Sequence, residues 1–183
     1  MKKIIAGLFV IGFLFSACEK DDICDPATPT TPRLVLRFFD KNNISVARRT
    51  TNLKIIGYIG DGFPDSKPLL DPSDKEVWND TLVYLPLRVN EDSTKYKLIL
   101  NADDTNDQND LTDVLEINYT RSNFYISRAC GFKTLFDLFG DPLRDPFVLN
   151  NVPDTVTGNW INDIQVIQSQ INDENEAHIY IFF

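Results

Sequence analysis

The sequence contains one histidine, His178, and no Cys-x-x-Cys or Gly-x-Ser-x-Gly motif. Hydrolases with a serine or cysteine nucleophile need a base beside it, and histidine is the usual base. His178 lies in an alternating segment at 177–183, which is typical of a β-strand rather than of a nucleophile elbow. A zinc site rich in histidine is excluded for the same reason. We therefore expect no catalytic triad and no zinc centre.

Basic residues are also scarce. The chain has 18 Lys and Arg against 27 Asp and Glu, a formal net charge of −9. An acidic surface repels phosphate backbones, and nucleic-acid binding requires clustered Lys and Arg. We expect no nucleic-acid partner, and no attachment to anionic lipid through a basic face.

The first eighteen residues have the layout of an export signal. A basic tip, Lys2 and Lys3, is followed by an apolar run at 4–15 and by the small residues Ser16 and Ala17. The run is too short to span a bilayer, as a secretory signal requires. Residues 14–18 (Leu-Phe-Ser-Ala-Cys) resemble a bacterial lipobox. Phe15 departs from this pattern, because the residue three places before the cysteine is usually aliphatic. We expect residues 1–17 to be removed, which leaves a net charge of −11, and Cys18 to carry the acyl chains that anchor the protein.

Cys24 and Cys130 are the two cysteines that remain after Cys18. An even pair in an exported protein predicts a disulfide, because exported thiols are usually oxidised. Two free, buried thiols are the alternative, because a sequence does not show whether two cysteines are close in space.

Residues 18–32 predict an acylated cysteine followed by a flexible tether rich in Pro and Thr. Glu19-Lys20-Asp21-Asp22 resembles the acidic signal that routes some Bacteroidota lipoproteins to the cell surface. We expect an outer-membrane protein exposed at the cell surface; the alternative is a solvated linker on a protein that faces the periplasm.

From residue 33 to residue 183 we expect one all-β domain. Short segments alternate apolar and polar residues, or are rich in β-branched and aromatic residues, between turn-forming residues. They predict an antiparallel β-sandwich of the Ig-like or Greek-key type, with at most one short helix. Pro86 places its strand at an edge or bulge. Residues 133–139 fit either two helical turns or a strand. The predicted strands are residues 33–39, 53–59, 81–89, 95–100, 114–120, 123–128, 161–168 and 177–183.

Three segments carry a resemblance to a known group of proteins: residues 18–24 (Cys-Glu-Lys-Asp-Asp-Ile-Cys), 30–40 (Thr-Thr-Pro-Arg-Leu-Val-Leu-Arg-Phe-Phe-Asp) and 127–134 (Ser-Arg-Ala-Cys-Gly-Phe-Lys-Thr). In these the chain resembles an uncharacterised family of small Bacteroidota lipoproteins. The resemblance implies a secreted, β-rich lipoprotein and supports the pairing of Cys24 with Cys130. It implies no activity, because none is assigned to that family.

Two groups of side chains are weak candidates for binding. Oxygen ligands for calcium are dense at residues 101–113, where the candidates are Asp103, Asp104, Asp107 and Asp110. The segment lacks the glycine and glutamate of an EF-hand, so a solvated turn is the favoured interpretation. The tryptophans Trp78 and Trp160 could form a platform for a sugar or peptide, but aromatic residues more often fill β cores.

The sequence favours a lipid-anchored envelope protein without enzymatic activity or cofactor, which binds a protein or glycan partner or has a structural role. One alternative is a surface polysaccharide hydrolase that uses two carboxylates and needs no histidine. Another is a β module stabilised by calcium. No pair of acids is singled out by the sequence.

Overall fold

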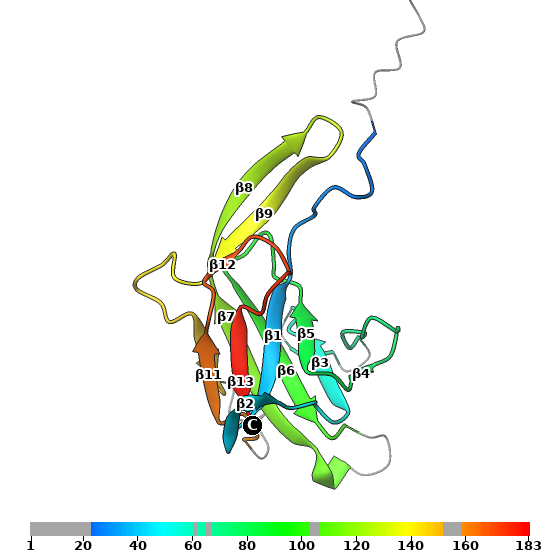
Figure 1. Cartoon of the computed structure of the whole chain (residues 1–183), viewed down its shortest axis with the longest axis vertical. Helices are drawn as coiled ribbons and strands as arrows, with labels where there is room; N and C mark the ends of the chain where they lie inside the picture. Colours follow the sequence, from blue (N-terminus) through cyan, green and yellow to red (C-terminus); the bar gives the residue numbers. More distant parts are fainter. Residues whose placement is uncertain (1–22, 61, 65–66, 103–106, 152–158) are drawn as a thin grey trace, which may run out of the picture. The chain divides into compact units, whose positions relative to one another are not determined.

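A computed structural model describes residues 23–60, 62–64, 67–102, 107–151 and 159–183 (Figure 1). The predicted signal segment and Cys18 lie outside the described residues. Within the described ranges the chain is all-β, with a single short 3-10 helix (η2, Asp107–Asn109). In the described residues no helix is long and apolar enough to cross a membrane.

The strands follow one another along the chain. Their bounds are β1 (Leu34–Asp40), β2 (Asn43–Ala47), β3 (Leu53–Gly57), β4 (Val77–Trp78), β5 (Leu82–Leu85), β6 (Ser93–Leu100), β7 (Leu111–Asn118), β8 (Thr120–Ser127), β9 (Gly131–Asp137), β10 (Phe147–Leu149), β11 (Asp163–Val166), β12 (Gln170–Ile171) and β13 (Ile179–Phe182). Each of the eight predicted segments contains or overlaps one of them. The alternation at 133–139 belongs to β9, so the helical alternative for these residues was wrong.

Strand β1 is the centre of the first five-stranded sheet, whose order is β11-β13-β1-β2 with β5 also paired to β1. β13 runs along one edge of β1. On the other edge, β5 pairs with residues Leu34 to Arg37, and β2 pairs with Phe39 and Asp40. The β1–β13 pair is parallel, and the other pairs of this sheet are antiparallel. The sheet is therefore mixed, where a purely antiparallel one was expected.

The second five-stranded sheet has the order β10-β7-β6-β3-β4, and its pairs are antiparallel. A third sheet joins β12, β9 and β8 in that order. Strand β5 ends at Leu85, directly before Pro86, because a proline nitrogen cannot donate to the ladder.

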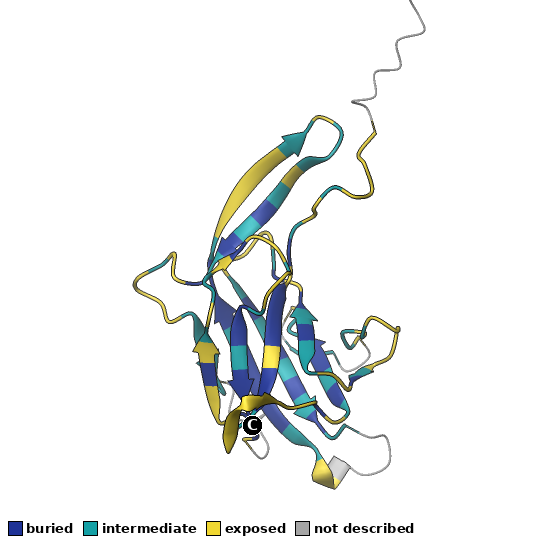
Figure 2. Cartoon of the chain, viewed as in Figure 1, coloured by how far each residue is buried: buried dark blue, intermediate teal, exposed yellow. Residues whose placement is uncertain are grey.

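One hydrophobic core lies between the two five-stranded sheets. In β1, Leu34, Leu36 and Phe38 are fully buried, and in β6 the inward positions are Tyr96, Leu98 and Leu100 (Figure 2). Both sets belong to the same cluster of packed side chains. Open sheets that share a core fit the predicted β-sandwich and do not close into a barrel.

The chain forms two compact units. The larger contains Thr31–Ser122 and Thr134–Phe183, and the smaller combines the described residues 23–30 with Asn123–Lys133. Strand β8 therefore begins in the larger unit and ends in the smaller one, and β9 begins in the smaller unit and ends in the larger one.

Candidate functional site

The larger unit has a pocket of about 290 Å³ on the solvent side of its first sheet. It is formed by β1, β5, β13 and the loop that leads into β13. Its lining residues are Val35, Arg37, Leu82, Tyr84, Ile167, Glu174, Asn175, Glu176, Ala177 and Tyr180. The volume is at the lower end of the range for ligand pockets, which suits a small polar group or one part of a larger ligand.

Strand alternation brings the pocket side chains together. Leu34, Leu36 and Phe38 of β1 point into the core, so Val35 and Arg37 face outward. Tyr84 of β5 lies opposite Val35, and Tyr180 of β13 lies opposite Arg37. Residues directly opposite on one face of a sheet have neighbouring side chains. Two tyrosines therefore flank the outward face of β1.

Glu174, which lines the pocket, forms a charged pair with Arg33. The Glu174 carboxylate accepts hydrogen bonds from Arg33 Nε at 2.9 Å, Arg33 Nη2 at 2.6 Å and the Arg33 backbone N–H at 2.8 Å. The same guanidinium lies over the Tyr84 ring, 4.6 Å from its centroid. Hydrogen bonding to Arg33 lowers the pKa of Glu174, and the same bonds raise the pKa of Arg33. Glu174 is thus held in its ionised form.

The ionised state of Glu174 makes it unsuitable as a general acid. A glycosidase needs one carboxyl group that stays protonated to act as a general acid, and its pKa must be raised. Glu174 and Glu176 are the two carboxylates of the lining, and the pKa of Glu174 moves in the opposite direction. The arrangement offers fixed charges and tyrosine rings to a bound ligand, which are means of recognition.

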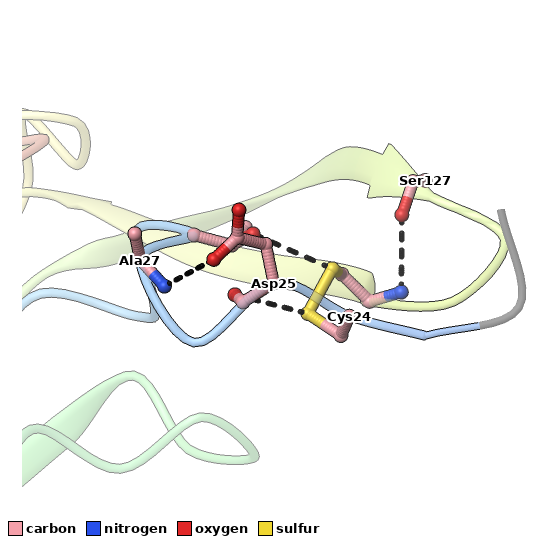
Figure 3. Close-up of a disulfide and its surroundings, with 6 residues drawn as sticks. Cys24, Asp25, Ala27 and Ser127 are labelled. Atoms are coloured by element: carbon pink, nitrogen blue, oxygen red, sulfur yellow. Dashed lines mark hydrogen bonds between the residues drawn. A yellow bond between two sulfur atoms is a disulfide. The ribbon is translucent and has the colours of Figure 1, made fainter. Parts of the chain in front are cut away.

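The smaller unit is closed by a disulfide between Cys24 and Cys130, whose Cα atoms are 4.8 Å apart (Figure 3). Cys130 lies between β8 and β9, and its backbone N–H donates to Ser127 Oγ at 3.1 Å. After Cys24, a turn is held by the Asp25 side chain, which accepts from the Ala27 N–H at 2.9 Å. The predicted disulfide is present, so the alternative of two free thiols is wrong, and the second half of the expected tether is attached to the hairpin.

The hairpin of the smaller unit exposes large apolar side chains on both of its faces. On one face Tyr125 and Phe132 meet edge to face with ring centroids 5.2 Å apart. On the other face Lys133 Nζ lies 5.7 Å from the centroid of Phe124. All three rings are more than half exposed. Beside the disulfide, a hollow of about 460 Å³ is lined by Ile23, Asp25, Thr28 and residues 125–130.

Residues 71–183, more than half of the chain, match the model of a family of unknown function, DUF6452. The chain belongs to this family. The match covers β4 to β13 and therefore includes the hairpin, the loop at 174–177 and β13, whereas β1 precedes it. No curated protein and no solved structure matches the chain.

In this member of the family, the tryptophans named from the sequence belong to the core. Trp78 is 2% exposed and donates from Nε1 to the Leu69 carbonyl at 2.9 Å. Trp160 is 5% exposed, donates to the Leu98 carbonyl at 3.2 Å, and stacks on Phe38. Neither ring forms a platform at the surface, because both fill space between strands.

The acidic residues named from the sequence are only partly described. Asp103 and Asp104 lie outside the described residues. Asp107 begins the short helix η2, and Asp110 immediately precedes β7. In the described ranges, no group of three or more His, Cys, Asp or Glu side chains could hold a metal ion. The calcium hypothesis gains no support from the described part of this loop.

The pocket residues were missed from the sequence, although part of the signal was present. Alternation at 33–39 and 177–183 indicates that Arg37 and Tyr180 point away from the core. It does not indicate that β13 lies parallel to β1, which places Tyr180 beside Arg37. The residues around Glu174 are turn-forming, and their pattern does not indicate that Glu174 lines a pocket.

Proposed function

We propose that this chain is a lipid-anchored envelope protein whose β-sandwich binds a protein or glycan partner and catalyses no reaction. Cleavage before Cys18 and acylation of that residue provide the anchor. The observation that carries the binding role is the pocket lined by Arg37, Tyr84, Tyr180 and Glu174, whose carboxylate is paired with Arg33.

The composition of the pocket supports recognition of a polar ligand. Tyrosine offers an apolar face for a sugar ring or a peptide side chain and a hydroxyl for hydrogen bonding. Arg37 is exposed and offers planar donors to a carboxylate or hydroxyl group. The pocket is lined by residues of three neighbouring strands, which suits a partner that places one group in it and lies across the surrounding sheet.

The location we propose is the outer membrane, with the β domain at the cell surface. The support is the acidic run Glu19-Lys20-Asp21-Asp22 directly after Cys18. Display at the surface would give the pocket access to extracellular glycans and proteins. A domain that faces the periplasm would meet a different set of partners.

The anchor is tested by intact-mass analysis of the protein extracted from membranes. We expect a polypeptide that begins at Cys18 and carries acyl chains, and a Cys18→Ala variant that leaves the membrane fraction. Protease added to intact cells should degrade the domain if it is displayed at the surface. An unmodified chain that begins at another residue would contradict the anchor, and protection from protease would contradict surface display.

The binding role is tested by cross-linking and affinity capture from solubilised membranes, together with a glycan array. Arg37→Glu reverses a charge inside the pocket, and Lys41→Glu makes the same change at the exposed turn after β1. Arg37→Glu should lose the captured partner or glycan, and Lys41→Glu should retain it. Equal retention by both variants, or turnover of a polysaccharide in the same panel, would contradict the proposal.

A further inference from the structure

The disulfide determines which part of the protein lies near the anchor. Six positions separate Cys18 from Cys24, so the connecting chain spans at most about 22 Å when fully extended. Cys24 is bonded to Cys130 at the tip of the β8–β9 hairpin. If Cys18 carries lipid, as proposed above, the tip is covalently held within that short reach of the bilayer surface.

The tip exposes the kind of side chain that partitions into a membrane interface. Phe124, Tyr125 and Phe132 are 55%, 52% and 67% exposed, and Ile23, next to Cys24, is 82% exposed. Four large apolar groups in contact with water are unfavourable in an isolated soluble domain. Tyrosine is favoured at the level of the lipid headgroups, where one end of the side chain is apolar and the other is hydrated, and phenylalanine is found on the apolar face of elements that lie in the interface.

The charges of the hairpin fit the same surface. The part of the hairpin in the smaller unit, residues 123–133, contains Arg128 and Lys133 but no Asp or Glu, although acids outnumber bases by 27 to 18 in the whole chain. Lys133 lies against the Phe124 ring. A lysine in that position can place its ammonium group among phosphates while its stem and the neighbouring ring reach deeper. No acidic side chain of this segment repels the headgroups.

We propose that the β8–β9 hairpin docks on the lipid surface, with Phe124, Tyr125, Phe132 and Ile23 inserted at headgroup depth. The insertion is shallow, because β8 is the edge strand of its sheet and its unpaired backbone groups need water. The acyl chains hold the protein at the membrane. The hairpin adds a second, non-covalent contact whose effective concentration is set by the short, disulfide-closed connection.

The test uses the mature, acylated protein in vesicles of phosphatidylethanolamine and phosphatidylglycerol, with or without bromine on the acyl chains. Phe132→Trp places a reporter on the hairpin, and Ile44→Trp places one at the equally exposed β2. The native Trp78 and Trp160 are buried, so the unsubstituted protein supplies the background. At interfacial depth, brominated lipid should quench the Phe132→Trp emission roughly twofold more than that of Ile44→Trp.

The disulfide supplies the decisive comparison. Combining Phe132→Trp with Cys24→Ser and Cys130→Ser leaves Cys18 acylated but frees the hairpin from the anchor, so the added quenching should fall. Circular dichroism confirms that each variant is folded.

The possible failures are distinguishable. Protein that does not float with the vesicles and lacks acyl mass would overturn both the anchor and this proposal. Acylated protein that floats, but whose Phe132→Trp emission is quenched no more than that of Ile44→Trp, would overturn the hairpin contact alone. If the Phe132→Trp side chain becomes shielded from solvent only after membrane proteins are added, the hairpin binds a protein partner in place of lipid. That result would also overturn the proposed contact with lipid.

Discussion

His178 and Val35 are joined by two reciprocal hydrogen bonds. The backbone N–H of Val35 donates to His178 Nδ1 at 3.0 Å, and the backbone N–H of His178 donates to the Val35 carbonyl at 2.9 Å. Because Nδ1 is the acceptor, the imidazole is neutral and carries its proton on Nε2. The only histidine of the chain thus fixes the entry of β13 beside β1, and it serves structure.

The pH dependence of stability should report this histidine. Burial lowers the pKa of His178 below its usual 6.5, against an opposing effect of Asp173. The unfolded chain therefore takes up a proton first as the pH falls. The stabilisation is complete above about pH 6.5 and decreases below it, by at most about 1.4 kcal/mol per pH unit for one proton. Urea unfolding at pH 8.0 and 5.5 measures it. His178→Asn, which keeps an acceptor near Nδ1, should show a smaller loss over this range; an equal loss would contradict the assignment.

Removal of the disulfide should lower the free energy of unfolding without abolishing the fold. Cys24 and Cys130 are 106 residues apart, and a crosslink over such a loop stabilises by about 4–5 kcal/mol in the chain-entropy model. The folded Cys24→Ser, Cys130→Ser variant regains freedom in the released N-terminal segment, which offsets part of this loss. We expect a net decrease of about 2–4 kcal/mol by urea unfolding. The unsubstituted protein under reducing conditions is the control and should match the variant; an unchanged midpoint in both would contradict the prediction.

The strands that could be predicted from the sequence are those with one face in the core. β1, β6 and β13 alternate or bury most of their residues, and their apolar positions were visible in the sequence. β2 was missed because all five of its residues are exposed, so no hydrophobic periodicity marks it. β4 and β12 have two residues each, which is too short for a periodic signal.

The disulfide was predictable, but its structural consequence was not. The count of cysteines and the predicted export of the chain favoured a disulfide between Cys24 and Cys130, which the structure contains. That Cys130 lies at a hairpin tip depended on residues 133–139 being a strand, and their pattern also fitted a helix. The pocket required the parallel pairing of β1 with β13, which joins segments more than 140 residues apart. Long-range register of this kind has no local signature.

The Arg33–Glu174 pair should contribute modestly and in a manner that depends on pH. The side chains are 45% and 30% exposed, so solvent screening limits the contribution to about 1 kcal/mol. Because the pKa of Glu174 is lowered from 4.5, the stabilisation is present above that pH and is lost as the pH falls through the folded-state value. Glu174→Gln should reduce stability at pH 6 and low salt, and less at high salt. Glu176→Gln, in the same loop, is the matched control; identical thermal midpoints for the two variants would refute the role of the pair.

Gly140 should tolerate no side chain, because a Cβ at this position would lie 1.8 Å from Thr120 Oγ1 and 2.8 Å from Thr120 Cβ. Rotation of Thr120 moves its hydroxyl but not its Cβ, so Gly140→Ala forces a backbone shift. We expect a loss of about 1–3 kcal/mol in the free energy of unfolding, as for other overpacked sites. Gly62→Ala is the control, since nothing lies within 4 Å of its Cβ. Thr120→Ala added to Gly140→Ala should restore part of the stability, because it removes the closest atom and leaves the Cβ contact. Strictly additive effects of the two substitutions would show that the side chains do not meet.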